Sequence, residues 1–140
     1  MPIRTMLSIP GNTPAAEGRR FIVRALTIWI VLFVLVTTYI LGNGILNGTV
    51  NPAYTWAGLP PLLLVLLAAC ALIWATVKGY ILAGIVASIL CLMHLYSLLG
   101  FFYGSPLKMI EDIINAILSI MVLRGTFLWI RHKDEEPSGA

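Results

Sequence analysis

The stretch LPPLLLVLLAACALIWATVKGYILAGIVASILCLMHLYSLLGFFY (residues 59–103) decides the fold of this chain. Its one formal charge is Lys78, which is also the only charge between residues 25 and 107. A soluble domain needs charged faces, whereas hydrocarbon penalises each buried charge. As a single helix the stretch would be about 68 Å long, roughly twice the thickness of a bilayer core. The sequence therefore predicts an integral membrane protein in which this stretch folds back at Lys78 and Gly79.

Four segments are long and apolar enough to cross a bilayer, which takes about 20 residues. Gly79 suits the C-cap of the second segment, and Ser105 with Pro106 is typical of a helix start. We predict an all-α fold, a four-transmembrane-helix bundle with antiparallel neighbouring spans and short loops. The predicted spans are residues 21–41, 59–77, 80–103 and 107–130.

The segments outside the spans are short. Residues 19–131 are predicted to form the membrane domain, with an outer loop at residues 42–58 and a very short one at 104–106. Residues 1–18 lack a helical period, so we expect a flexible or partner-bound N-terminal tail. Residues 132–140 are expected to form a polar C-terminal tail.

Lysine and arginine are distributed unequally between the two sides of the predicted bundle. One side receives only Lys108, and by the positive-inside rule the opposite, cation-rich side faces the cytoplasm. Both termini are therefore predicted to be cytoplasmic, and we expect the inner membrane of a bacterium as the location. Cations at a membrane border can contact lipid headgroups, directly or by snorkelling. The residues predicted to do so are Arg19, Arg20, Arg24, Lys78, Arg124 and Arg131.

Composition argues against several classes of function. The net charge of +3 comes from cations at membrane borders, so we expect no nucleic-acid partner. Cys70 and Cys91 lie inside apolar runs twenty-one residues apart, which predicts neither a disulfide framework nor a redox pair. No motif for a cofactor is visible, and we expect none to be bound.

Small residues recur along the third predicted span and are typical of close helix packing in lipid. One row has four-residue spacing and a second row lies beside it, while the second span offers alanines of its own. We predict that these rows bring the helices of the hairpin together or receive a helix of a partner subunit. The packing residues are Gly79, Ala83, Ala87 and Cys91 in one row and Gly84 and Ser88 in the other, facing Ala68, Ala71 and Ala75.

His94 and Asn115 form the centre of a candidate intramembrane polar site. Each lies nine residues, or about 13 Å, from the outer border of its span, so a hydrogen bond between them is predicted. Asp112 and Ser119 share the helix face of Asn115, and Glu111 precedes them. The site either stabilises helix packing through a hydrogen bond between helices or forms a proton or cation path. A metal or haem ligand would need a further ligand from another chain.

Two functional hypotheses follow. The first is an accessory or assembly subunit of a larger membrane complex, such as a respiratory or photosynthetic one, which binds partner helices and lipid. The second is a small oligomeric transporter or channel for protons or cations, which requires water to reach His94. Two isolated polar residues do not form a catalytic constellation, so we expect no enzymatic activity. Lys108 also offers Glu111 and Asp112 a simple ion pair one helical turn away.

Overall fold

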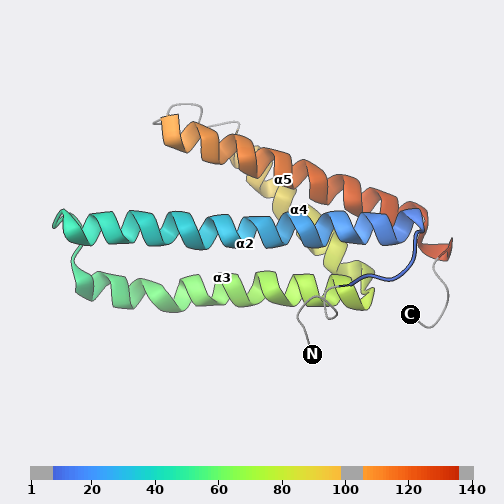
Figure 1. The fold of residues 1–140 in the computed structure, drawn as a ribbon, viewed down its shortest axis with the longest axis horizontal. Helices are drawn as coiled ribbons and strands as arrows, with labels where there is room; N and C mark the ends of the chain where they lie inside the picture. Colours follow the sequence, from blue (N-terminus) through green and yellow to red (C-terminus); the bar gives the residue numbers. More distant parts are fainter. Residues whose placement is uncertain (1–7, 99–105, 136–140) are drawn as a thin grey trace.

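Four long helices make up most of the computed structural model, which describes residues 8–98 and 106–135. Within those ranges no strand occurs, and each long helix is long and apolar enough to cross a membrane. The chain is therefore an all-α integral membrane protein, as predicted. In chain order the helices are α2 (Pro14–Leu46), α3 (Pro52–Lys78), α4 (Ile81–Leu98), α5 (Pro106–Arg131) and the 3-10 helix η1 (Lys133–Glu135) (Figure 1).

Several predictions fall on positions outside the described residues. These are residues 1–7 of the predicted N-terminal tail, residues 99–103 of the third predicted span, residues 104–105 of the short outer loop with the predicted capping role of Ser105, and residues 136–140 of the C-terminal tail. Within the described part of that tail, His132 Nδ1 lies 2.8 Å from Glu135 Oε1.

Helix α2 begins earlier than predicted, at Pro14. The hydroxyl of Thr13 accepts a hydrogen bond from the backbone N–H of Ala16 at 3.2 Å, and Pro14 occupies the first helical turn. A capping Thr followed by Pro is sufficient to start a helix ahead of the hydrophobic run. The prediction of a tail at residues 1–18 is therefore wrong for residues 14–18.

The predicted outer loop at residues 42–58 is also wrong in extent, because only residues 47–51 lie between α2 and α3. The side chain of Asn51 accepts a hydrogen bond from the N–H of Ala53 at 3.0 Å, and Pro52 follows it at the helix start. Helix α3 then continues through Pro60 and Pro61. Local capping thus places the helix start before these prolines.

The turn between α3 and α4 forms at the predicted position. Gly79 is the C-cap of α3 and adopts a φ of 88°, a left-handed conformation that glycine tolerates. The N–H groups of Gly79 and Tyr80 donate to the carbonyls of Thr76 and Ala75. Because α4 begins at Ile81, Gly79 ends one helix and does not extend the small-residue row of the next.

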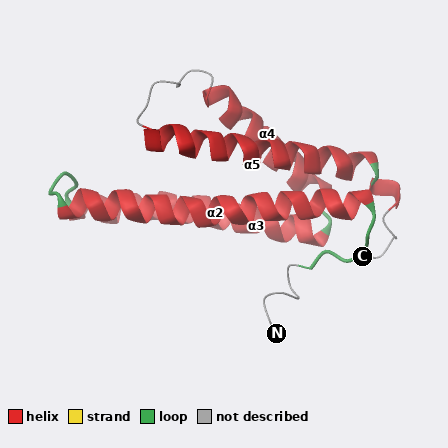
Figure 2. Ribbon diagram, turned by 45° about the horizontal axis from the view of Figure 1, so that its top comes forward, coloured by secondary structure: helices red, strands yellow, loops and turns green. Residues whose placement is uncertain are grey.

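The helices form two antiparallel pairs that meet at one end. Helices α2 and α3 run side by side, and α4 and α5 form the second pair (Figures 1 and 2). The start of α2 and the ends of α3 and α5 lie together, so we call this the cation-rich end. From there α5 diverges from α2 toward the opposite end (Figure 1). Residues of the main core cluster include Ile22, Ala25, Ala87, Val122 and Trp129.

Gly84 of α4 packs against α5, which corrects the predicted interface with α3 at this position. Ala83, Gly84 and Ala87 are buried. The hydroxyl of Thr126 donates to the carbonyl of Gly84 at 3.1 Å, and a Cβ added at Gly84 would lie 3.1 Å from the Trp129 ring. The indole of Trp129 and the hydroxyl of Thr126 on α5 therefore occupy the space beside Gly84.

The remaining small residues have other surroundings. Ala68 and Ala71 of α3, the predicted partners of the row, are exposed. Ser88 is half-buried, and its hydroxyl oxygen is buried without a hydrogen-bond partner among the described residues. Cys91 is half-buried and lines the cavity described below.

Candidate functional site: a cavity between the four helices

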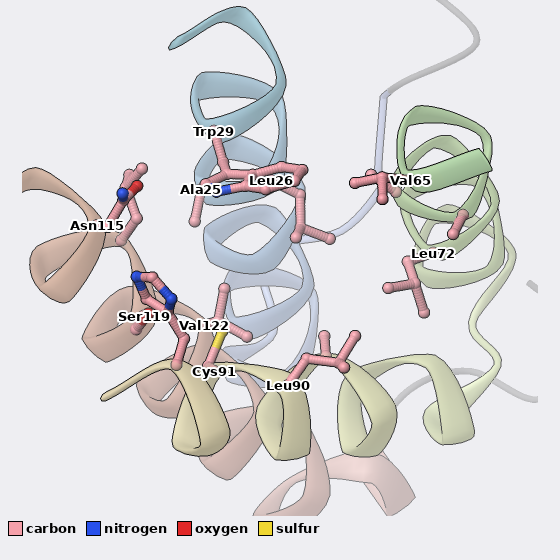
Figure 3. Close-up of a pocket in the computed structure, with 15 residues that line it drawn as sticks. Ala25, Leu26, Trp29, Val65, Leu72, Leu90, Cys91, Asn115, Ser119 and Val122 are labelled. Carbon is pink, nitrogen blue, oxygen red and sulfur yellow. The ribbon is translucent and has the colours of Figure 1, made fainter. Parts of the chain in front are cut away.

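A cavity of about 350 Å³ lies between the helices, and all four of them line it (Figure 3). Most of its wall is apolar. Figure 3 shows Val65 and Leu72 of α3 on one side, with Asn115 and Ser119 of α5 on the other. The alanines in the lining leave the space that larger side chains would fill, namely Ala25, Ala68, Ala69 and Ala87.

The polar part of the cavity wall comes from α4 and α5. His94 and Cys91 of α4 line it together with Asn115 and Ser119 of α5. Ser119 is buried, and its hydroxyl lies near the Cys91 thiol. The structure thus brings three of the five predicted polar-site residues, His94, Asn115 and Ser119, to one cavity.

His94 and Asn115 do not form the predicted hydrogen bond. The Nε2 atom of His94 is buried and has no hydrogen-bond partner among the described residues. Equal depth on neighbouring helices brought both side chains to the same cavity. A contact between the two side chains also depends on the rotation of each helix about its axis, and depth along the helix does not determine that rotation.

Asp112 and Glu111 have different surroundings. Asp112 accepts a hydrogen bond from the Lys108 ammonium at 2.7 Å, one helical turn away, as the ion-pair interpretation predicted. Glu111 lines a second hollow of about 410 Å³ between α2 and α5. Trp29 and Asn115 line both hollows. The predicted polar stripe is therefore divided among an ion pair, the cavity and this second hollow.

Arg19 is buried, with 4% of its surface exposed, which contradicts its predicted contact with lipid headgroups. Its Nε donates to the carbonyl of Thr76 at 2.9 Å, and its Nη2 donates to that of Val77. The guanidinium carbon lies 5.5 Å from the ring centroid of Trp129. Carbonyls at the end of a helix lack intrahelical donors and favour a cation. Arg19 therefore ties α2 to the end of α3 and to α5.

The other predicted headgroup contacts are more exposed. Arg20 is half-buried and donates to the carbonyl of Ile9 at 2.8 Å and to that of Gly11, which holds residues 8–13 against α2. Headgroup contact stays a prediction for the exposed residues Arg24, Lys78, Arg124 and Arg131.

Sequence reasoning missed the close backbone contact between Gly18 of α2 and Gly125 of α5. A Cβ added at Gly125 would lie 2.5 Å from the carbonyl oxygen of Gly18. The available signal was a glycine in the middle of an apolar helix, which is typical of close helix approach in lipid.

No protein-family model, curated protein or solved structure matches this chain. Among residues 8–98 and 106–135, no group of three or more His, Cys, Asp or Glu side chains converges. The polar side-chain groups that line the cavity are the imidazole of His94, the carboxamide of Asn115, the hydroxyl of Ser119, the thiol of Cys91 and the indole of Trp29.

Proposed function

We propose that this protein is an accessory or assembly subunit of a larger membrane protein complex, and that it binds a transmembrane helix of a partner. The proposed binding surface is the hollow between α2 and α5, here called the α2–α5 groove. Apolar and aromatic side chains form most of its wall, and Glu111, Lys108 and Asn115 are its charged and carboxamide members. Its apolar lining includes Leu32, Val36 and Ile40 of α2 and Ile110 and Ile114 of α5.

The observation that carries this proposal is the pair Glu111 and Asn115. They lie one helical turn apart on α5, and both line the groove. Glu111 is half-buried and makes no hydrogen bond with another described residue; its charge acts on nearby Lys108, whose ammonium donates to Asp112. A half-buried carboxylate next to hydrocarbon is more stable with a polar or cationic partner. We infer that the partner helix presents a cationic or amide side chain to Glu111 and a hydrogen-bond donor to the carboxamide oxygen of Asn115.

Helix association in lipid depends on packing and on polar contacts between helices, because lipid tails are as apolar as leucine. An apolar groove with two polar side chains at one-turn spacing offers both. The alternative function, a proton or cation path through His94, requires water along the four-helix cavity. The largely apolar wall of that cavity supports the subunit over the transporter.

The proposal includes an orientation. The positive-inside rule puts the cation-rich end on the cytoplasmic side of a bacterial inner membrane. Exposed Arg24, Lys78 and Arg131 would then lie near anionic headgroups. The polar end of the α2–α5 groove, at Lys108 and Glu111, would face the opposite side.

Site-specific photo-crosslinking in the native membrane tests the proposed surface. The photoreactive residue p-benzoylphenylalanine replaces either Val36, which lines the groove, or its neighbour Leu35, which is exposed and does not. We expect one discrete adduct with another protein from position 36 and none from position 35. Glu111→Gln should weaken that adduct, whereas Glu17→Gln, which changes an exposed carboxyl near the start of α2, should leave it intact.

Three results would contradict the proposal. These are no adduct from position 36, equal adducts from positions 35 and 36, or an adduct of twice the mass of this chain, which shows self-association only. Insensitivity of the adduct to Glu111→Gln would reject the inferred polar partner.

A further inference from the structure

We propose that the four-helix cavity binds a neutral, membrane-soluble molecule that has an apolar body and a carbonyl group, with the carbonyl held by His94 and Asn115. The cavity volume of about 350 Å³ lies within the size range of small-molecule sites. Such sites combine apolar walls with a few polar groups that fix the orientation of the ligand. This cavity has that composition, and it is distinct from the α2–α5 groove although Trp29 and Asn115 line both.

The depth of His94 in the membrane indicates that the part of the ligand in contact with it is uncharged. His94 is thirteen residues after Ile81, the first residue of α4, or about 20 Å along the helix from the cation-rich end. A bilayer core is about 30 Å thick, so His94 lies within hydrocarbon. A charged headgroup is strongly disfavoured at that depth. The molecule that reaches His94 therefore carries a neutral polar group.

The imidazole of His94 indicates which neutral group it is. Neither ring nitrogen makes a hydrogen bond with a described residue, and only Nε2 is fully buried. A neutral imidazole has one N–H donor and one acceptor nitrogen. At the buried Nε2, an unpaired N–H donor would cost more free energy than an unpaired acceptor nitrogen. The proton of the neutral imidazole therefore belongs on Nδ1. Nδ1 is then a donor that needs an acceptor, and a carbonyl oxygen supplies one.

Asn115, on the neighbouring helix α5, adds a second hydrogen-bond donor. Its side chain lines the cavity and makes no hydrogen bond with another described residue. A carboxamide has two N–H donors, so Asn115 and His94 can converge on one carbonyl oxygen, which has two lone pairs. The apolar body of the ligand would then extend between Val65 and Leu72 of α3 and Leu90 of α4.

Quenching of tryptophan fluorescence tests this site with decyl-benzoquinone as the probe, because Trp29 lines the cavity. The full chain in lipid nanodiscs should show a saturable component of quenching. His94→Phe should weaken this binding about tenfold, as expected for one lost hydrogen bond to a neutral ligand, whereas His94→Gln, which keeps a donor, should bind within about threefold of wild type. Decylbenzene carries the same decyl chain on a six-membered ring without carbonyl groups, so it should bind about tenfold more weakly than the quinone and displace it only in excess.

A matched pair of variants locates the binding. Ala68 and Ala71 are both exposed on α3, and only Ala68 lines the cavity. Ala68→Phe should remove the saturable quenching, whereas Ala71→Phe should leave it unchanged. Circular dichroism on each variant checks that the helices are retained.

Several outcomes would overturn the proposal. The site is rejected if wild type shows no saturable quenching or if Ala68→Phe binds as wild type does. Recognition of a carbonyl is rejected if His94→Phe binds the quinone as tightly as wild type does, or if decylbenzene displaces the quinone at equal concentration. The last result would show that the cavity accepts any hydrocarbon.

Discussion

The backbones of Gly18 and Gly125 touch where α2 crosses α5 at the cation-rich end. A Cβ added at Gly125 would lie 2.5 Å from the Gly18 carbonyl oxygen, and one added at Gly18 would lie 2.9 Å from the backbone nitrogen of Trp129. Both distances are too short for a real side chain. Because lipid gives no hydrophobic drive between helices, close backbone approach of this kind is a main source of their association.

Gly125→Ala is therefore expected to lower the free energy of unfolding by about 1–3 kcal/mol, the usual cost of overpacking a well-packed contact. SDS-driven unfolding followed by tryptophan fluorescence measures this change. Gly42→Ala is the matched control within α2, because nothing lies within 4 Å of a Cβ at Gly42. The control should leave stability unchanged or raise it by up to about 1 kcal/mol. Equal effects of the two substitutions would show that the crossing is not tight.

Arg19→Lys tests the contact between the guanidinium and the end of α3. Lysine keeps the charge but lacks the planar fork that reaches the carbonyls of Thr76 and Val77 and stacks over Trp129. We expect the free energy of unfolding to fall by about 1.5–3 kcal/mol, the worth of hydrogen bonds to a charged group. The same SDS titration measures it.

The control for that substitution is Arg24→Lys, since Arg24 is exposed on the same helix. An exposed substitution of this kind should change stability by less than about 0.5 kcal/mol. If Arg19→Lys has an effect as small as the control, Arg19 acts through its charge at the membrane border and not through its hydrogen bonds.

The hydrophobic pattern was sufficient to predict the number of helices and the turn at Gly79. A single charge inside a long apolar stretch leaves few places where the chain can reverse. The starts of α2 and α3 were missed because they depend on local capping by Thr13 and Asn51, outside the apolar runs. Hydropathy reports which residues lipid accepts, and it says little about a helix that extends beyond the hydrocarbon.

Arg19 and His94 show why the site was only partly predictable. Counting cations treats every arginine at a membrane border alike. The burial of Arg19, however, depends on its hydrogen bond to the carbonyl of Thr76, which lies fifty-seven residues further along the chain. Position along a helix brought His94 and Asn115 to the same cavity. Whether their side chains bond depends on helix rotation, which is set by contacts elsewhere, such as that of Gly84 with Trp129.

Thr126→Val tests the hydrogen bond that joins α5 to α4. The Thr126 hydroxyl is buried and donates to the Gly84 carbonyl at 3.1 Å, and valine has the same shape without the donor. Such interhelical bonds are worth about 0.6 kcal/mol on average in membranes, so we expect a loss of about that size in SDS unfolding. Thr27→Val is the control, because the Thr27 hydroxyl bonds to Val23 within its own helix. A loss no greater than that of the control would show that this bond adds nothing between the helices.

His94→Leu, studied without added ligand, distinguishes a ligand-binding histidine from one that forms a structural hydrogen bond between helices. Because the buried Nε2 has no hydrogen-bond partner among the described residues, its replacement by an apolar side chain should leave the free energy of unfolding unchanged or raise it. Combining His94→Leu with Asn115→Leu in a double-mutant cycle should give a coupling energy near zero, since the two side chains do not bond. A stabilising coupling of about 0.6 kcal/mol or more, the usual value for an interhelical hydrogen bond, would instead show that His94 and Asn115 form a structural hydrogen bond. It would also contradict the availability of His94 to a carbonyl ligand, because its donor would already be used.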